Sequence, residues 1–513
     1  MAEMKHYTLG EYVKLLEEKG MLAEYNLQGK DGEEIKLLTY DSREVTQGTL
    51  FICKGTAFKA EYLKNSMNQG AVCYVSEKKY ELEKEVPYIL VKGIRDAMAV
   101  LANFFYNKPW EDLAVIGFGG TKGKSTSTYY MKAVVDDYLA AQDKPESAVI
   151  STIDIYDGKS KVESHITTPE AVELQMHLRN ALDCNIEYAE MEISSQALKY
   201  GRVDEMQFDV SVFLNISEDH ISPIEHPDFE DYFQSKMKMF EKSKIAVVNL
   251  DADYIDQILE ASKAAGEVVT FSTKNPEADY YAYNIHKEGK DIHFSVKCEA
   301  FDEEFVLTMP GFFNVENALG VVAASVKLGI PTEYIHSGLR RARSSGRMEF
   351  YHSKDHEVMA IVDYAHNKLS FEKLFSAMKE EFPDYGLVAI FGCPGKKSLL
   401  RRKYLGTIAG QYSKMVYLVA EDPGYEPVED ISKEIAQYVE AQKCPYKMIE
   451  DRGEAIKDAI ETAEGKTLLL VTGKGAETRQ KYGCEYLDCP SDVEYVQRYL
   501  AEYDSRHWKV TKD

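Results

Sequence analysis

Short apolar runs alternate with amphipathic stretches along most of the chain. The runs cover residues 149–155, 188–193, 210–214 and 245–250, and then 387–391, 415–420 and 468–472. Runs of this length, apolar on both faces, are typical of strands in a parallel sheet that helices cover. The pattern therefore predicts an α/β protein in which the central and C-terminal parts each hold a mostly parallel sheet.

The stretch 228–242 predicts an amphipathic helix. Its apolar face carries Phe229, Phe233, Met237 and Phe240, and Lys236 lies on the same face. A lysine in this position either extends its ammonium group to solvent or is a buried amine that loses its charge and can be modified. The sequence pattern leaves both interpretations open.

The length of the chain predicts several domains. With 513 residues it is too long for one hydrophobic core, so three domains are expected. Boundaries are predicted near residues 107–110 and 344–347. The predicted domains are 1–109, 110–345 and 346–513.

A glycine-rich loop joins the apolar run 113–116 to a stretch with helical spacing. It reads Gly120-Thr121-Lys122-Gly123-Lys124-Ser125-Thr126. In such a loop, backbone N–H groups and the helix N-terminus attract a phosphate, and the lysine side chain reaches the outer phosphates. Phe118 replaces the first glycine of the common pattern, and a glycine turn without a ligand is the alternative. The flanking strand and helix favour ATP or GTP binding, with Ser125 or Thr126 offering a hydroxyl group to Mg²⁺.

Polar residues follow two of the predicted central strands. Glu192 closes the run 188–193, and Asp219 and His220 follow the run 210–214. The carboxyl ends of parallel strands meet at one sheet edge, so these side chains are expected near the glycine loop, where they could hold Mg²⁺ or phosphate. A solvated carboxylate and a structural histidine are the alternatives.

The last third of the chain adds two more candidate groups. Asp363 and His366 follow a predicted strand, and a basic glycine loop at 391–397 precedes Arg401 and Arg402. In an acidic protein such a basic cluster indicates an anion contact, with a solvated basic turn as the alternative.

Charge and cysteine content limit the classes of partner. The formal net charge is −24, which disfavours nucleic acid and anionic membranes as partners. Eight scattered cysteines predict reduced thiols rather than a disulfide framework. The N-terminus lacks the apolar segment of a signal peptide, and no run has the length of a membrane span. We expect a cytoplasmic monomer.

Taken in order along the chain, these motifs resemble the Mur ligase family. The matching positions are the loop 120–126, Thr167 to Pro169, Glu192 to Ser195, Asn215, Asp219, His220, Lys236, Asn249, Asn314, Asn317, Arg347 and Asp363 to His366. The resemblance covers nearly the whole chain. It implies a UDP-binding α/β N-terminal domain, a central P-loop ATPase domain with a mostly parallel sheet, and a C-terminal Rossmann-like domain that binds the incoming amino acid.

The resemblance also implies roles for individual residues. The loop 120–126, Asn249, Asn314, Arg347 and Asp363 would bind ATP. Ser125 or Thr126, Glu192, His220 and Lys236 would bind Mg²⁺, with Lys236 carbamylated, and Lys124, Glu192, His220 and Lys236 would be catalytic. Substrate contacts would come from Ser42, Arg43, Thr167, Thr168, Ser194, Arg202, His366, Glu421, Asp422 and Glu477.

Within the family, the chain is most similar to members that add the third amino acid to UDP-N-acetylmuramoyl-L-alanyl-D-glutamate. Diaminopimelate-adding members carry Asp-Asn-Pro-Arg where this chain has Glu421-Asp422-Pro423-Gly424. An acidic pair without arginine suits the side-chain ammonium group of L-lysine and repels a carboxylate. The resemblance therefore implies an ATP-dependent ligase that adds L-lysine through an acyl phosphate.

Departures from the family pattern leave alternatives open. They are Glu421, Gly424, Lys368, Ala476 and the stretch 396–400, all around the expected amino-acid pocket. Diaminopimelate, ornithine or another amino acid therefore remains a candidate substrate. Two further alternatives are a folylpolyglutamate synthase, which the N-terminal residues argue against, and a nucleotide-binding paralogue without catalysis.

Overall fold

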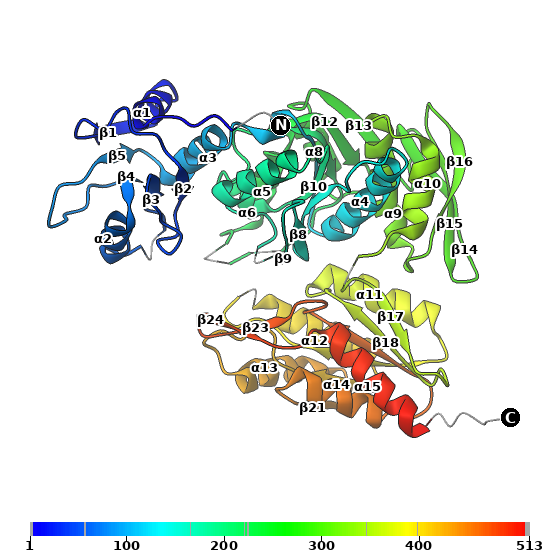
Figure 1. Ribbon diagram of the computed structural model, residues 1–513. Helices are drawn as coiled ribbons and strands as arrows, with labels where there is room; N and C mark the ends of the chain where they lie inside the picture. Colours follow the sequence, from blue (N-terminus) through cyan, green and yellow to red (C-terminus); the bar gives the residue numbers. More distant parts are fainter. Residues whose placement is uncertain are drawn as a thin grey trace.

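Three large β-sheets follow one another along the chain (Figure 1). The computed structural model describes residues 4–55, 58–164, 166–219, 221–222, 225–344, 346–397 and 399–507. Each sheet is flanked by helices from its own part of the sequence. Within the described residues, no helix is both long enough and apolar enough to cross a membrane.

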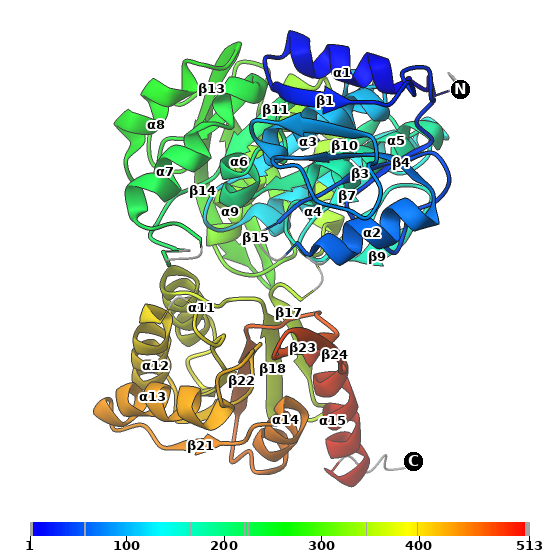
Figure 2. The same ribbon diagram turned by 90° about the vertical axis from the view of Figure 1, so that its left-hand side faces the viewer.

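The N-terminal sheet has five strands in the order β1-β5-β4-β3-β2. Only β1 is antiparallel to its neighbour. The sheet lies against the central part of the molecule (Figure 2), where Lys54 forms a 2.7 Å ion pair with Glu170. The elements are α1 (Leu9–Glu18), β1 (Leu22–Asn26), β2 (Leu37–Thr39), β3 (Thr49–Ile52), α2 (Ala60–Gln69), β4 (Ala71–Ser76), β5 (Tyr88–Val91) and α3 (Ile94–Phe105).

The central sheet has eleven strands in the order β16-β15-β14-β13-β12-β11-β6-β10-β7-β8-β9. The strands from β14 to β7 are parallel, and both ends of the sheet are antiparallel. The strands are β6 (Ala114–Gly119), β7 (Ala148–Ile150), β8 (Asp154–Tyr156), β9 (Lys161–Glu163), β10 (Tyr188–Ile193), β11 (Phe208–Phe213), β12 (Ser243–Asn249), β13 (Glu267–Ser272), β14 (Tyr280–Glu288), β15 (Asp291–Lys297) and β16 (Asp302–Leu307).

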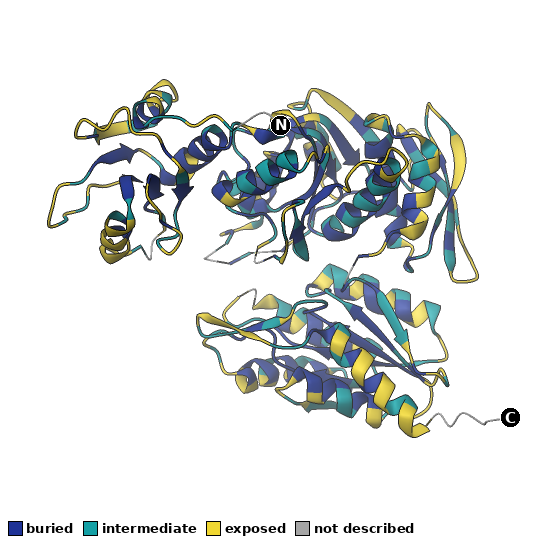
Figure 3. Ribbon diagram, in the orientation of Figure 1, coloured by how far each residue is buried: buried dark blue, intermediate teal, exposed yellow. Residues whose placement is uncertain are grey.

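Helices cover both faces of the central sheet, and the strands between them are buried (Figure 3). The helices are η1 (Pro109–Glu111), α4 (Lys124–Ala140), α5 (Ala171–Asp183), α6 (Ser195–Lys199), α7 (Phe229–Met237), η2 (Phe240–Lys242), α8 (Ile255–Ser262), α9 (Phe313–Lys327) and α10 (Thr332–Arg341).

The C-terminal sheet has six strands in the order β17-β18-β22-β19-β20-β21, and only β17 is antiparallel. A two-stranded ribbon, β23 with β24, follows it. The elements are β17 (Glu349–His352), β18 (Val358–Asp363), α11 (Lys368–Glu381), β19 (Gly386–Phe391), α12 (Leu400–Tyr412), β20 (Met415–Leu418), α13 (Val428–Ala441), β21 (Tyr446–Met448), α14 (Arg452–Glu461), β22 (Thr467–Thr472), β23 (Arg479–Tyr482), β24 (Glu485–Asp488) and α15 (Asp492–His507).

The predicted α/β class with mostly parallel sheets is confirmed. All but one of the seven apolar runs fall on single strands, with ends that differ by one or two residues. The exception is 149–155, which forms two antiparallel strands, β7 and β8. The Ser151 hydroxyl group accepts the N–H groups of Ile153 and Asp154 at 3.0 and 3.3 Å, so the chain reverses there.

The predicted helix 228–242 is also shorter than expected. It ends at Met237, and a 3-10 turn at Phe240–Lys242 follows. Both Met239 and Phe240 are fully buried, so the chain tightens there to turn their side chains into the core. The Ser243 hydroxyl group bonds to the Met239 carbonyl group at 2.7 Å and closes the turn.

Helices α4 and α10 pack closely at Gly338, and this contact makes a stability prediction. A Cβ atom at Gly338 would lie 2.4 Å from the Val134 Cα atom, which is backbone and cannot move aside cheaply. We expect Gly338→Ala to lower the free energy of unfolding by about 1–3 kcal/mol or more. Urea unfolding measures this. As a control, Gly32→Ala, which meets open space, should change stability by less than about 0.5 kcal/mol; equal effects would contradict this packing.

Candidate functional site

The glycine loop lies between β6 and α4, as predicted, and two further glycines lie in the strand that precedes it. Gly117 and Gly119 lie in β6, where a Cβ atom would come within 2.4 Å of Ile193 and 2.5 Å of Met239. Gly120 and Gly123 form the turn itself, with φ angles of +142° and +83°. The glycines therefore serve two needs, space within the sheet and a left-handed turn before the helix.

Two lysine ammonium groups meet at one carbonyl oxygen of this loop. Lys124 Nζ donates to Gly120 O at 3.0 Å, and Lys236 Nζ donates to the same oxygen at 2.8 Å. Lys236 is 2% exposed, so the interpretation in which it extends to solvent is wrong. Burial, with Lys124 second, holds the pKa of Lys236 well below its usual value, and burial also lowers the pKa of Lys124.

Helix α7 is tied to the loop by a second contact. The hydroxyl groups of Tyr232 and Thr121 lie 2.9 Å apart, and Lys236 Nζ lies 4.9 Å from the centre of the Tyr232 ring. Burial raises the pKa of Tyr232, so it stays a neutral phenol. Helix α7 therefore fixes both the loop and the position of Lys236.

A cavity of about 160 Å³ opens in front of the loop. Glu192 reaches it from the end of β10, and its Oε1 atom accepts the N–H group of Thr152 at 2.8 Å. Glu192 is 1% exposed, which excludes a solvated strand end. The lining residues are Thr121, Lys122, Gly123, Lys124, Ser125, Thr126, Thr152, Thr167, Glu192, Asp219, Arg347, Tyr364 and His366.

Of the predicted substrate residues, Thr168 is bonded to Ser194 and Arg202 beside this cavity, and Thr167 lines it. Thr168 Oγ1 donates to the carbonyl group of Glu192 at 2.8 Å and lies 3.2 Å from Ser194 Oγ, and Arg202 donates to the Thr168 carbonyl group at 3.1 Å. Thr167 lies at the rim, bonded to Thr152 at 3.2 Å. The structure therefore brings the Thr-Thr and Glu-Ser motifs together.

A second cavity, of about 100 Å³, lies on the other side of the loop. It is lined by Asn314, Arg347 and Asp363, and by Asn317, whose Nδ2 atom donates to Asn314 at 3.1 Å. Arg347 also bonds to Ser125 at 3.0 Å. Asn249 lies elsewhere: it lines neither cavity and donates to the Leu214 carbonyl group at 2.8 Å.

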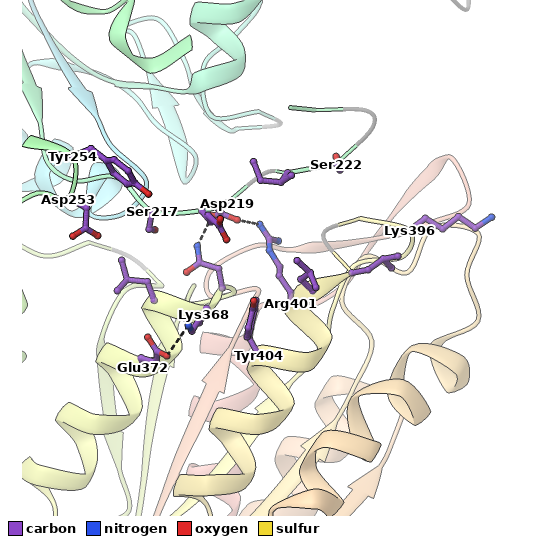
Figure 4. A pocket seen from close by; sticks show the side chains of 16 residues that line it. Ser217, Asp219, Ser222, Asp253, Tyr254, Lys368, Glu372, Lys396, Arg401 and Tyr404 are labelled. Carbon is purple, nitrogen blue, oxygen red and sulfur yellow. Dashed lines mark hydrogen bonds and ion pairs between the residues drawn. The ribbon is translucent and has the colours of Figure 1, made fainter. Parts of the chain in front are cut away.

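Asp219 joins the loop to the C-terminal part of the chain (Figure 4). Its carboxylate accepts Asn367 Nδ2 at 2.6 Å and Arg401 Nη2 at 2.8 Å, and it lies 3.6 Å from Lys122 Nζ. Burial lowers the pKa of Lys122 to about 7. These contacts border a cavity of about 490 Å³ between residues 217–219 and 221–222 and the first turns of α11 and α12. The predicted site residue His220 lies outside the described residues.

The predicted amino-acid residues line a pocket of about 350 Å³ in the C-terminal part. Lys474 Nζ lies 3.1 Å from Asp422 and is also paired with Glu477, so the two carboxylates share one ammonium group. Glu421 is buried, and desolvation raises its pKa to about 7. His366 borders the pocket and the loop cavity, and burial holds its pKa well below the usual value.

The pocket is less acidic than the sequence suggested, because basic groups share it. Lys396, Lys397, Arg401 and Lys481 also line it. Arg402, the other arginine of the predicted anion contact, instead pairs with Glu426 at 2.7 Å and with Glu434 at 2.5 Å. One of the two arginines after the basic loop therefore lines the site, and the other forms structural ion pairs.

Ser42 and Arg43 lie in the N-terminal part, away from these four cavities. Arg43 bonds to Asp41 at 2.9 Å and is largely exposed. Two residues that sequence reasoning did not single out are Tyr232 and Asn367. Asn367 could have been found as the N-cap of α11, because its side chain accepts the Ser370 N–H group, but its contact with Asp219 crosses 148 residues.

The phosphate-type loop lies between a strand and a helix in the middle one of three α/β units. This arrangement defines a multidomain nucleotide-binding α/β protein. The Mur ligase middle domain matches residues 119–325, and the glutamate ligase domain of Mur ligases matches residues 346–475. A relative from Enterococcus faecalis, named UDP-N-acetylmuramoyl-L-alanyl-D-glutamate–L-lysine ligase, is 38% identical over 87% of this chain and 88% of its own. The chain belongs to the Mur ligase family.

Solved structures of the family share the fold. A UDP-N-acetylmuramoyl-L-alanyl-D-glutamate–2,6-diaminopimelate ligase superposes with a TM-score of 0.64 at 23% identity, covering 98% of this chain and all of its own. A MurF ligase from Thermotoga maritima, solved in complex with ADP, superposes with a TM-score of 0.60 at 17% identity, covering 91% of this chain and 98% of its own. The predicted family and three-domain fold are confirmed, whereas the exact domain boundaries stay predictions.

The loop geometry makes a prediction about nucleotide binding. A Cβ atom at Gly123 would lie 2.2 Å from Asn317 Oδ1, and its φ of +83° disfavours any side chain. We expect Gly123→Ala to weaken ATP binding at least about tenfold, since the backbone strain alone costs about 1–2 kcal/mol. Isothermal titration calorimetry with ATP measures this. Gly465→Ala, with φ of +60° and open space around it, carries the strain without the clash and should bind normally; loss of binding in both variants would contradict the argument.

Proposed function

We propose that this chain is an ATP-dependent ligase that adds L-lysine to the D-glutamate γ-carboxylate of UDP-N-acetylmuramoyl-L-alanyl-D-glutamate. The observation that carries the proposal is the arrangement of three adjoining cavities that share Tyr364, two of which are lined by the glycine loop. The L-lysine ligase relative, matched over most of both chains, supports it. Both ATP and a UDP-linked precursor are cytoplasmic compounds, so we place the reaction in the cytoplasm.

ATP would lie across the two cavities beside the loop. The Asn314 and Asp363 side chains would contact the nucleoside, and the loop amides with Lys122 and Lys124 would hold the phosphates. Anionic phosphates would relieve the repulsion between the ammonium groups of Lys124 and Lys236, which share one carbonyl oxygen. The preorganised cations would then stabilise charge as the phosphoryl group is transferred.

The residues beside the phosphates fit Mg²⁺. Hydroxyl groups of Ser125 and Thr126 and the buried carboxylate of Glu192 line one cavity, and oxygen donors are the ligands that Mg²⁺ prefers. His220 and a carbamylated Lys236 would complete the set. When bound, Mg²⁺ neutralises charge on the phosphates.

The chemistry follows in two steps. The γ-carboxylate of D-glutamate attacks the γ-phosphorus of ATP and forms an acyl phosphate, with ADP as the leaving group. The lysine α-amine attacks the acyl carbon and loses a proton, and the tetrahedral intermediate expels phosphate to form the amide. Thr167, Thr168, Ser194 and Arg202 would orient the carboxylate, because Thr167 lines the cavity in front of the loop and the other three are bonded together next to it.

The lysine would bind in the C-terminal pocket. The buried carboxyl group of Glu421 would meet the side-chain ammonium group, since Asp422 and Glu477 already share the ammonium group of Lys474. Basic groups at Lys396, Lys397 and Arg401 would meet the α-carboxylate. This differs from the expectation of an acidic pair, and it assigns the selection of an ammonium group to one carboxyl group.

Phosphate release tests the proposed function. The purified protein is supplied with ATP, Mg²⁺ and UDP-N-acetylmuramoyl-L-alanyl-D-glutamate, and with L-lysine, L-ornithine or meso-diaminopimelate in separate reactions. We expect turnover with L-lysine to exceed turnover with diaminopimelate at least about 100-fold, because the side-chain carboxylate of diaminopimelate would be buried against Glu421. A preference for diaminopimelate or ornithine would overturn the substrate, and no turnover with any of them would overturn the activity.

Replacing Lys236 tests its role in the reaction. We expect Lys236→Ala to lower kcat at least about 100-fold, as loss of one preorganised charged group at a reaction centre does. Lys238→Ala, two residues along and exposed, is the matched control and should keep its activity. Thermal unfolding should show both variants folded, and full activity of Lys236→Ala would contradict the carbamate role.

The raised pKa of Glu421 predicts a pH dependence. With a pKa of about 7, its carboxyl group is protonated below pH 7 and ionised above it, whereas the lysine side chain stays charged throughout. The KM for L-lysine should therefore fall as the pH rises from about 6 to 8, and Glu421→Gln should show a high KM without this change. Glu429→Gln, an exposed carboxyl group on α13, should keep the normal profile; a flat profile in the unaltered protein would contradict the assignment.

A further inference from the structure

The antiparallel edge of the central sheet carries a group of metal-ligand side chains that the proposed reaction does not use. His286 lies on β14, His293 on β15 and Glu304 on β16. Their ligand atoms all lie within 4.8 Å of one another. Three strands, β13, β12 and β11, separate β14 from β6 and the phosphate loop, so this group is distinct from the nucleotide site (Figure 1).

Strand register places the three side chains on one face. His286 lies directly opposite His293, and the two rings are stacked with centroids 5.5 Å apart. Glu304 lies two residues along from Val306, the partner of His293, and its Oε1 atom is 3.0 Å from His293 Nδ1. Cross-strand neighbours of this kind are fixed by the sheet rather than by flexible loops.

The backbone sets the orientation of one imidazole. His286 Nδ1 lies 2.8 Å from the carbonyl group of Asn284, to which it donates as the N–H tautomer. The register of β14 shifts between Tyr283 and His286, and Asn284 has a φ of +55°, so a bulge places this carbonyl group. The bond leaves the Nε2 lone pair free to bind a metal. Metal-ligating histidines commonly donate their other ring N–H group to a carbonyl group in this way.

We propose that His286, His293 and Glu304 bind one divalent transition-metal ion of the Zn²⁺ type. Zn²⁺ takes nitrogen and carboxylate oxygen ligands at about 2.0–2.2 Å in a tetrahedron, in which a water molecule can fill the fourth position, and the ligand atoms of these three side chains lie within 4.8 Å of one another. Two imidazoles disfavour Mg²⁺, so the ion expected at the phosphate loop does not compete.

The metal would join β14, β15 and β16. Lys287, the next residue on β14, points to the opposite face of the sheet and forms a 3.3 Å ion pair with Glu381 at the end of α11. The sheet edge that carries the ion is therefore also a contact with the C-terminal part of the chain. Binding to the folded state alone would raise the unfolding temperature, and the rise would grow with the logarithm of the free metal concentration above the Kd.

Competition titration with a chromophoric Zn²⁺ chelator, at saturating Mg²⁺, tests the proposal. We expect His286→Gln/His293→Gln to bind one equivalent of Zn²⁺ fewer than the unaltered full-length protein and to lose the Zn²⁺-dependent rise in unfolding temperature. Glu304→Gln should weaken that site about tenfold. Lysine-ligase activity with Mg²⁺ should be unchanged in both variants.

The matched control uses another stacked histidine pair. His352 and His356 have ring centroids 4.3 Å apart, but in the described part of the chain they form no group with a third ligand. His352→Gln/His356→Gln should bind as many equivalents as the unaltered protein. Equal stoichiometry for the His286→Gln/His293→Gln variant, or the same loss in the control, would overturn the proposal, and a Mg²⁺-supported activity assay distinguishes this from failure of the proposed function.

Discussion

The rest of the site depends on positive charge gathered around one carbonyl oxygen. Lys124 and Lys236 both donate to Gly120 O, and Lys122 lies close enough for its charge to lower the pKa of Lys236. Like charges held together in a poorly solvated site are costly unless anions join them. Under the proposed function, nucleotide phosphates and a carbamate in place of one ammonium group would be the anions that satisfy this constraint. The phosphate loop, helix α7 and the buried lysine thus form one electrostatic unit.

Asp219 extends this unit to the C-terminal sheet. Its carboxylate is shared by Lys122 beside the loop and by Asn367 and Arg401 from the C-terminal part. Arg401 also lines the pocket proposed for the amino acid. A change in charge at the loop therefore acts, through two contacts, on the residues that would hold the second substrate. This geometry suits an enzyme in which phosphoryl transfer and amine attack must occur in one enclosed space.

Sequence reasoning predicted the parts that depend on local pattern. The mostly parallel sheets, the loop between β6 and α4 and the strand-end position of Glu192 follow from periodicity and glycine spacing. It failed where a single side chain overrides the pattern, as when Ser151 reverses the chain within a continuous apolar run. It also missed contacts between residues far apart in sequence, such as Tyr232 with Thr121, because no local signal reports them. Sequence reasoning also misjudged the charge of the amino-acid pocket, because no local signal reports that Lys474, which follows a different strand, pairs with Asp422.

The central claim is that the site activates a carboxylate by phosphorylation, and isotope transfer tests it most directly. UDP-N-acetylmuramoyl-L-alanyl-D-glutamate labelled with ¹⁸O in its γ-carboxylate is turned over with ATP and L-lysine, and the released phosphate is examined by mass spectrometry. An acyl phosphate requires one ¹⁸O atom in each phosphate released. Phosphate without ¹⁸O, formed alongside the amide product, would contradict the account.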